Sequence, residues 1–393
     1  MAPPPVDRSM PPGPGDDELA AWLWLLHAPG LGRSGARRVM AALGPPAAVL
    51  AAAPQDWQAL GGPALADALR APPAGHAERL AAVLAWRRGA AGRRVMVLGE
   101  ADYPAALLQT ADPPLLLYLQ GDAALLNAPS LAIVGSRQPS AQGREHARRF
   151  ARALAGRGWT IVSGLAAGID GAAHEGALAG LDEGGGSAGS TIAVVGTGLD
   201  RVYPPGHRAL AQRIAVQGLL VSEMDLGTPP LAANFPQRNR IIAGLARGTL
   251  VVEAALRSGS LITARLAAEA GREVMALPGS LLSPQSAGCH ALIRQGAALV
   301  TSVDEVLQEL GATAAPPPMA AAETAGDAPG DDAAPAAADP VLDALGHDPQ
   351  TLDALIARCG WPAPALSARL LALEIEGLVA RLPGGLYQRV GRG

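Results

Sequence analysis

The stretch LAIVGSRQPSAQGREHARRFARALAGRGWTIVSG, residues 131–164, decides the fold class. Two short runs of apolar and β-branched residues stand at its ends, and the segment from Gln142 to Ala155 between them has helical periodicity. A helix between two strands is the usual crossover that lets both strands run in parallel in one sheet. Residues 131–164 therefore predict a strand–helix–strand unit.

The same alternation extends over residues 93–310. Helical stretches separate nine short apolar runs: RVMVLG, LLLYLQG, LAIVGS, WTIVSG, STIAVVGTG, LLVSEM, TLVVEA, EVMALPG and ALVTS. Continuous apolar strands that alternate with amphipathic helices are typical of a parallel sheet covered on both faces. We expect an α/β core with a mainly parallel, doubly wound sheet.

Four further segments flank this core. Residues 1–17 are rich in proline and predict a disordered leader, and residues 18–90 predict a helical domain. Within it, LHAPGLGRSGARRVMAAL (26–43) fits either a helix-hairpin-helix DNA-binding module or an ordinary glycine-rich turn. Residues 311–339, rich in Ala, Pro and acids, predict a flexible linker, and residues 340–393 predict a winged helix.

Charge and cysteine content narrow the class of protein. The net charge is −4 and all 31 basic residues are Arg, but the stretch 311–340 carries acids and no Arg, so an anionic partner of the core is not excluded. The two cysteines are far apart, which argues against a disulfide framework or a zinc site. No apolar run reaches the roughly 18 residues of a membrane span. We expect a soluble cytoplasmic protein.

Several loops that follow the predicted strands combine glycines, hydroxyls and arginines. Ligands of open parallel sheets bind at the carboxyl ends of the strands, and free backbone N–H groups at helix N-termini bind phosphate. The segment NFPQRNRIIAG (234–244) adds two arginines, of which one could instead turn inward to a carboxylate such as Glu253. Together they predict a site for a polyanion or a nucleotide. The candidate residues are Gly135, Ser136, Arg137, Ser140, Ser163, Gly164, Arg238, Asn239, Arg240, Ser258, Gly259 and Ser260, with Arg257 as a further possible cation.

The sequence lacks the residues that several common enzyme and cofactor-binding motifs require. A chain without lysine has no Walker A lysine, and GTGLDRVYPPG keeps only part of the dinucleotide-binding pattern. Asp170 and His174 are one helical turn apart, yet we interpret them as a helix-capping residue and a packed histidine rather than an acid–base pair. We predict no catalytic residues, no metal site and no cofactor.

The motifs AIVGSRQPS, IVSGLAAGIDGAAHEGAL, TIAVVGTGLDRVYPPGHRAL and NFPQRNRIIAGLARGTLVVEAALRSGSLITARLAAEAGREVMALPG together resemble the DNA-processing protein A (DprA, also called Smf) family. The resemblance implies an extended Rossmann-like core between a helix-hairpin-helix or SAM-like domain and a winged helix. It implies a role that is not enzymatic: binding single-stranded DNA, forming a homodimer and loading the RecA recombinase in natural transformation. Single-strand-binding protein is a further implied partner.

The resemblance also assigns residues. By motif position it places DNA contacts at the candidates above and adds Phe235 as a stacking face for a base. Many relatives carry a lysine where this chain has Ala167, so another residue, such as Arg201 or Arg208, would have to supply that charge. Leu292 and Ile293 are the expected dimer interface.

Two other functions stay open. A nucleotide phosphoribohydrolase of related fold is one, because Glu253 precedes a serine-rich loop, although its Pro-Gly-Gly-x-Gly-Thr signature is absent. The other is an adaptor in which the helical domain and the winged helix contact protein partners.

Overall fold

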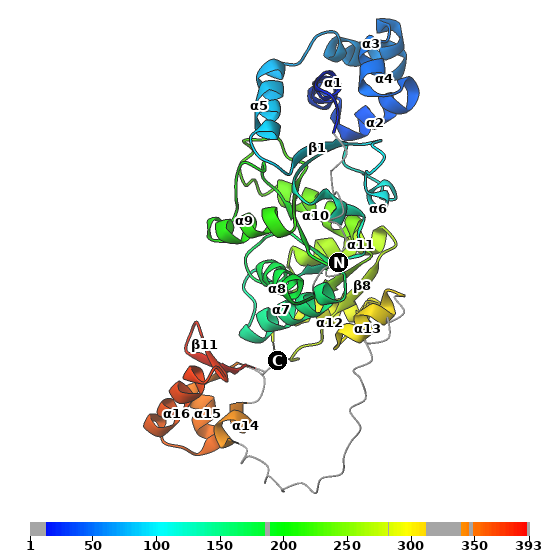
Figure 1. Ribbon diagram of the computed structural model, residues 1–393. Helices are drawn as coiled ribbons and strands as arrows, with labels where there is room; N and C mark the ends of the chain where they lie inside the picture. The colour runs from blue at the N-terminus through cyan, green and yellow to red at the C-terminus, as the bar shows by residue number, and fades with distance from the viewer. Residues whose placement is uncertain (1–12, 185–188, 282, 312–338, 346–348, 391–393) are drawn as a thin grey trace, which may run out of the picture.

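The computed structural model describes residues 13–184, 189–281, 283–311, 339–345 and 349–390 (Figure 1). They form a helical region, an α/β core and a small C-terminal domain, which confirms the predicted fold class. Most of the predicted leader, residues 1–12, and most of the predicted linker, residues 312–338, lie outside the described residues.

The helical region is an apolar bundle at the β1 edge of the core (Figure 1). Helix α1 begins at Asp16, inside the predicted leader, and the carbonyl of Pro14 already accepts a hydrogen bond from Arg87. The edge of the Trp86 ring packs on Tyr118, with 5.8 Å between the ring centroids, and ties the bundle to the core. Its helices are α1 (Asp16–His27), α2 (Gly32–Leu43), α3 (Pro46–Ala51), α4 (Pro54–Leu69) and α5 (His76–Arg88).

All nine predicted strand runs form strands of one sheet, in the order β1-β2-β6-β5-β4-β3-β7-β8-β9. The pairs from β6 to β9 are parallel, whereas β1 with β2 and β2 with β6 are antiparallel. The central strands are buried throughout, which explains their continuous apolar sequence. The strands are β1 (Arg93–Val97), β2 (Leu116–Gly121), β3 (Ser130–Val134), β4 (Thr160–Ser163), β5 (Thr191–Val195), β6 (Leu219–Ser222), β7 (Gly248–Val251), β8 (Glu273–Ala276) and β9 (Ala298–Leu299).

Helices cover both faces of this sheet. On one face lie α7 (Ala141–Gly156), α8 (Ile169–Gly184), α9 (Arg208–Gln217) and α13 (Val303–Glu309). On the other lie α6 (Ala105–Leu108), α10 (Asn234–Leu245), α11 (Ser260–Glu269) and α12 (Ala287–Arg294). Helices α7 and α8 pack closely because Gly176 and Gly180 lack a side chain: a Cβ at either would lie within 2.3 Å of a backbone oxygen of α7.

The C-terminal domain is a winged helix, as predicted. Its helices pack through Leu355, Leu366 and Leu370, and strands β11 and β12 form the wing, which turns at Gly384 and Gly385. The elements are α14 (Pro340–Leu345), β10 (Gln350–Thr351), α15 (Leu352–Cys359), α16 (Ala363–Ile375), β11 (Val379–Leu382) and β12 (Leu386–Arg389).

Candidate nucleic-acid interface

The order of strands reverses between β3 and β7, and the candidate pocket lies beside this reversal, over the carboxyl ends of β3, β4 and β5. From β3 the chain proceeds through β4 and β5 to β6 on one side, and then returns to β7 on the other. The loops at such a switch point diverge and leave a crevice at the carboxyl ends of the strands. A pocket lies at this edge, lined by Arg137, Gly164, Ala166, Ala167, Val195, Gly196, Thr197, Tyr203, Pro204, Phe235 and Arg238.

Arg238 is the buried cation of this pocket. It comes from the second turn of α10 and is only 4% exposed. Its Nη1 donates a hydrogen bond to the carbonyl of Val194 at 2.9 Å, while its Nε has no hydrogen-bond partner among the described residues. A buried guanidinium with an unused donor is unfavourable unless a ligand or a countercharge completes it.

Asp170 is the countercharge of Arg238. Its carboxylate accepts hydrogen bonds from the backbone N–H groups of Gly164 (3.1 Å) and Ala166 (3.4 Å) at the start of α8. Burial raises the pKa of Asp170, and the Arg238 charge opposes this shift. Burial lowers the pKa of Arg238 and Asp170 opposes it, yet an arginine stays charged in proteins. Arg238 therefore places a permanently charged guanidinium in the pocket, next to a buried carboxyl group.

Gly164 is required by this arrangement. A Cβ at this position would lie 1.3 Å from Nη1 of Arg238 and 2.1 Å from its Cζ. The missing side chain of Gly164 makes room for the guanidinium, and its predicted DNA contact stays a prediction.

His174 is a packed residue, as the sequence analysis interpreted it. It is fully buried, its Nε2 accepts a hydrogen bond from the backbone N–H of Leu165, and its Nδ1 lies 2.7 Å from the Thr191 hydroxyl. Burial, with contributions from His207 and Arg238, lowers the pKa of His174 to about 3. The ring is neutral at physiological pH and does not form an acid–base pair with Asp170.

Aromatic faces form the outer wall of the pocket. The guanidinium carbon of Arg137 lies 5.3 Å from the centroid of the Phe235 ring, and Tyr203 lies 5.8 Å from the same ring at 41°. Tyr203 is 41% exposed. The sequence analysis missed this tyrosine, although it lies in the loop after β5 in a chain with only four Tyr and two Phe. Such surfaces stack on nucleobases.

Two predicted serines do not point into the pocket. The buried Ser163 hydroxyl donates to the carbonyl of Ile133 at 2.6 Å, inside the sheet. The Ser140 oxygen caps α7 by accepting from Gly143 N–H at 2.9 Å and donates to Glu253 at 2.5 Å. Their hydroxyls are therefore committed to the fold, contrary to the predicted DNA contacts. Gly135 and Ser136 are half-buried in the loop after β3, and the predicted role of their backbone remains a prediction.

The sequence analysis named Glu253 as an inward partner of an arginine and as a possible hydrolase residue, and its contacts fit neither role. Its carboxylate accepts from both the backbone N–H and the hydroxyl of Ser140, and a Cβ on Gly143 would lie 2.3 Å from it. Burial raises the pKa of Glu253, and the two hydrogen bonds from Ser140 oppose this shift. Glu253 holds the N-terminus of α7, so the residue that suggested a hydrolase is engaged in structure.

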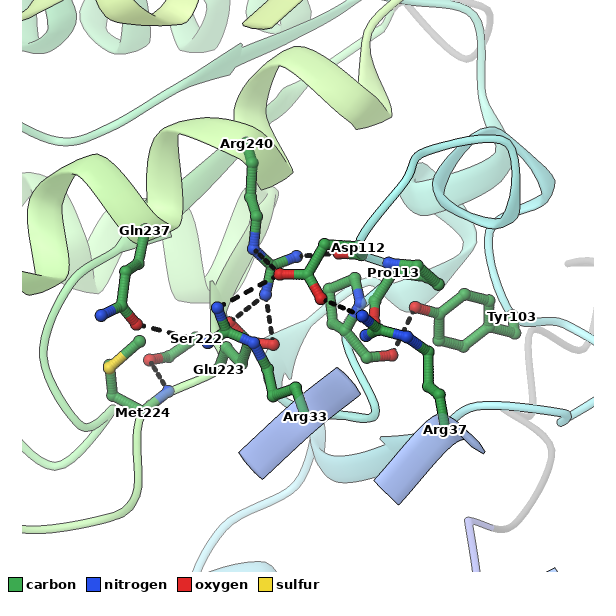
Figure 2. Close-up of polar contacts among 11 residues, drawn as sticks. Arg33, Arg37, Tyr103, Asp112, Pro113, Ser222, Glu223, Met224, Gln237 and Arg240 are labelled. Carbon is green, nitrogen blue, oxygen red and sulfur yellow. Dashed lines mark hydrogen bonds and ion pairs between the residues drawn. The ribbon is translucent and has the colours of Figure 1, made fainter. Parts of the chain in front are cut away.

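Arg240 points away from the pocket. Figure 2 shows its side chain directed from α10 toward Glu223 and Asp112, with which it forms ion pairs. The predicted phosphate contact of Arg240 is therefore wrong, and so is Glu253 as the inward partner. Residues two positions apart on a helix face roughly opposite sides, so Arg238 and Arg240 do not line the same pocket. Asn239 is buried, and its side-chain amide donates to the carbonyl of Gly259 at 3.4 Å; its predicted DNA contact stays a prediction.

The remaining candidates lie outside the pocket. Ser258, Gly259 and Ser260 begin α11, where the two serine hydroxyls lie 2.7 Å apart, and Arg257 beside them is exposed. Leu292 and Ile293 are partly buried on α12. DNA contact and dimer formation by these residues stay predictions. Ala167 is exposed on the pocket rim.

Two further observations bear on the class of site. No group of His, Cys, Asp and Glu residues in the described part of the chain could hold a metal ion. None of the helices among those residues is both long and apolar enough to cross a bilayer.

Comparison with known proteins agrees with the fold. The family model of DNA recombination-mediator protein A matches residues 94–311, and a model of the DprA winged helix domain matches residues 315–385. Protein Smf of Escherichia coli is 46% identical over 293 residues, which are 74% of this chain and 75% of that protein. The DNA processing protein DprA of Streptococcus pneumoniae is 49% identical over 207 residues, which cover 53% of this chain and 71% of the relative.

A solved structure supports the same assignment. The X-ray structure of DNA processing protein A from Streptococcus pneumoniae superposes with a TM-score of 0.62 at 36% identity, and covers 76% of this chain and 98% of that one. The match includes the α/β core that carries the pocket. The chain therefore belongs to the DNA recombination-mediator protein A (DprA/Smf) family.

Proposed function

We propose that this protein binds single-stranded DNA without sequence preference at the pocket between Arg137, Arg238 and the Phe235–Tyr203 surface. The observation that carries the proposal is the buried Arg238 over the carboxyl ends of β3, β4 and β5, whose Nε lacks a partner among the described residues. An anionic phosphate would complete this guanidinium, and the aromatic rings beside it would stack on the attached base.

The chemistry of the pocket favours single strands over duplexes. In a duplex the bases are already stacked on each other, so no base face is free to stack on Phe235 and Tyr203. Backbone amides and guanidinium groups hold phosphates without reading the base, which supports sequence-tolerant binding. With the family's lysine replaced by Ala167, the exposed Arg201 and Arg208 on the following segment are the candidates for the missing charge.

The wider role follows from family membership. We propose that the protein acts in the cytoplasm as a recombination mediator, not an enzyme, and loads the RecA recombinase onto incoming single strands in natural transformation, where it displaces single-strand-binding protein. We further propose a homodimer through α12 around Leu292 and Ile293. Two pockets on one dimer would raise the affinity for a long strand through a high effective concentration.

Fluorescence anisotropy with a labelled oligothymidylate and a duplex of equal length, at two salt concentrations, tests the binding proposal. We expect tighter binding of the single strand and a strong salt dependence. Arg137→Ala should weaken binding and reduce the salt slope by about 0.7, the value for one lost phosphate contact on a single strand. Arg70→Ala is the matched control, because Arg70 is exposed and pairs with Asp67 within its own helix. Equal affinity for both nucleic acids, or an unchanged Arg137→Ala variant, would refute the proposal.

The mediator role has its own assay. RecA hydrolyses ATP once it polymerises on DNA, so the lag of hydrolysis on a strand coated with single-strand-binding protein reports loading. We expect this protein to shorten the lag and Arg137→Ala to do so less. If the protein binds single-stranded DNA tightly but does not change the lag, the loading proposal is refuted and the binding proposal stands. Sedimentation of the wild type and Leu292→Ala tests the dimer.

A further inference from the structure

Five charged residues join the helical region to the core, and we call them the ionic clamp: Arg33, Arg37, Asp112, Glu223 and Arg240. Figure 2 shows Arg33 and Arg37 reaching from α2 toward the carboxylates, which Arg240 meets from α10 on the other side. Asp112 lies 3.1 Å from Arg33 Nη2 and 2.6 Å from Arg37 Nη2, and Arg33 Nη1 lies 3.4 Å from Glu223. Residues almost two hundred positions apart thus share one network.

Two residues of the ionic clamp are largely buried. The Glu223 side chain is 8% exposed and that of Arg240 15%. A buried carboxylate needs its countercharges, because leaving one charge unpaired in the interior is costly. Removing a partner from the helical side should therefore change how Glu223 and Arg240 are held, not only weaken a surface contact.

Helix α10 connects the ionic clamp to the pocket. Its first two turns place Phe235 and Arg238 at the pocket, and the same turns give Gln237 and Arg240 to the helical region. Arg33 Nη1 donates to Gln237 Oε1 at 3.3 Å. The helical region thus contacts the same two turns of α10 that carry the pocket residues Phe235 and Arg238.

A second contact holds the opposite wall. In the segment after β6, Asp225 lies 2.6 Å from His27 Nε2 of α1 and accepts a hydrogen bond from Tyr118 at 3.3 Å. The same segment contacts the loop after β5, since Gly198 N–H donates to Thr228 at 3.1 Å. The Ser222 hydroxyl donates to the carbonyl of Thr197, a residue of the pocket, at 2.7 Å.

We propose that the helical region is a positioning element of the DNA pocket, and that Arg33 and Glu223 are its positioning residues. Neither residue lines the pocket, and each acts through Arg240 and Gln237 on the helix that carries Arg238. The proposal rests on the single-strand binding proposed above. Docking of the helical region keeps Arg238 and the Phe235 face in the arrangement that binds a strand.

Two substitutions separate positioning from simple electrostatics. Glu223→Gln removes a negative charge, so a purely electrostatic effect would tighten DNA binding, whereas loss of positioning weakens it. Arg33→Ala should also weaken oligothymidylate binding, by about 3- to 30-fold, the range for residues that couple distant sites. The salt slope of Arg33→Ala should equal that of the wild type, because no phosphate contact is lost. Arg33→Lys, which keeps the charge toward Asp112, should recover part of the affinity.

The same anisotropy assay distinguishes failure of this inference from failure of the proposed DNA binding. Arg70→Ala removes an equal charge from the helical region without touching the core and should bind as the wild type does. Thermal unfolding is measured for each variant, and Arg33→Ala, on the more exposed side, carries the test if Glu223→Gln does not fold. Tighter binding by Glu223→Gln, or wild-type affinity in Arg33→Ala, would overturn the inference alone. A wild-type protein that does not bind the oligonucleotide would instead overturn the proposed function.

Discussion

Gly164→Ala is the most direct perturbation of the pocket. A Cβ would fall 1.3 Å from Nη1 and 2.1 Å from Cζ of Arg238, so the guanidinium must leave its place. The backbone of Gly164 is not in the left-handed region that favours glycine, so alanine adds a steric effect and no backbone strain. The displaced Arg238 loses its hydrogen bond to Val194 and its position beside Asp170.

The size of the effect follows from these contacts. A hydrogen bond that involves a charged group contributes about 1.5–3 kcal/mol, and the alanine returns about 0.4–1 kcal/mol by restricting the unfolded chain. We expect the free energy of unfolding to fall by about 0.5–2.6 kcal/mol. If Arg238 donates one such bond to a phosphate, its displacement weakens single-strand binding by roughly 10- to 150-fold.

Denaturant unfolding and anisotropy on the same preparation measure both numbers. Gly206→Ala is the matched control, because Gly206 follows the pocket residue Pro204 and has nothing within 4 Å of its added Cβ. Wild-type unfolding and affinity within twofold in Gly164→Ala would refute the assignment of Arg238 to the pocket floor. A loss of stability with unchanged affinity would show that Arg238 is structural only.

Three further predictions follow from the same site. Tyr203→Ala should weaken binding of oligothymidylate by about 1–3 kcal/mol, the value of one base stack, but leave an abasic oligonucleotide unaffected, and Tyr203→Phe should bind as the wild type does; equal losses on both oligonucleotides would argue against stacking. The pKa of His174 is lowered to about 3 in the folded state against an unfolded value near 6.5, so the unfolded chain binds the extra proton and stability falls as the pH drops below about 6.5. Between pH 7 and pH 5 this one residue should account for about 2 kcal/mol, and His174→Gln should flatten the unfolding profile by that amount. Ser140→Ala should lower the free energy of unfolding by about 1–2 kcal/mol through loss of the α7 cap, with single-strand affinity unchanged; a marked loss of affinity would restore its predicted DNA contact.

Sequence periodicity predicted the local structure well. The nine apolar runs became the nine strands of the large sheet, and the pattern after residue 340 became a winged helix. These features depend on the spacing of apolar residues along a few turns or one strand, which the sequence displays directly. The predicted start of the helical region was less accurate. The helix that begins at Asp16 is held by a hydrogen bond from Arg87, a tertiary contact that the local sequence does not display.

The individual site residues were harder to predict. A serine after a strand can point into a loop or back into the sheet, and Ser163 does the latter because the carbonyl of Ile133 lies 2.6 Å away. Tyr203 joins Phe235 although 32 positions separate them (235 minus 203). Neither contact follows from local pattern, since both partners come from other strands and loops.

By itself the sequence determined the α/β core, its position between a helical region and a winged helix, and the strand ends where an anion would bind. Only the tertiary structure decided what the two arginines of NFPQRNRIIAG do. Their side chains leave α10 in different directions, and each ends where its countercharge lies: Arg238 beside Asp170 in the pocket, and Arg240 beside Glu223 and Asp112 under the helical region. Countercharges far apart in sequence meet only after folding, and desolvation then makes each pairing specific.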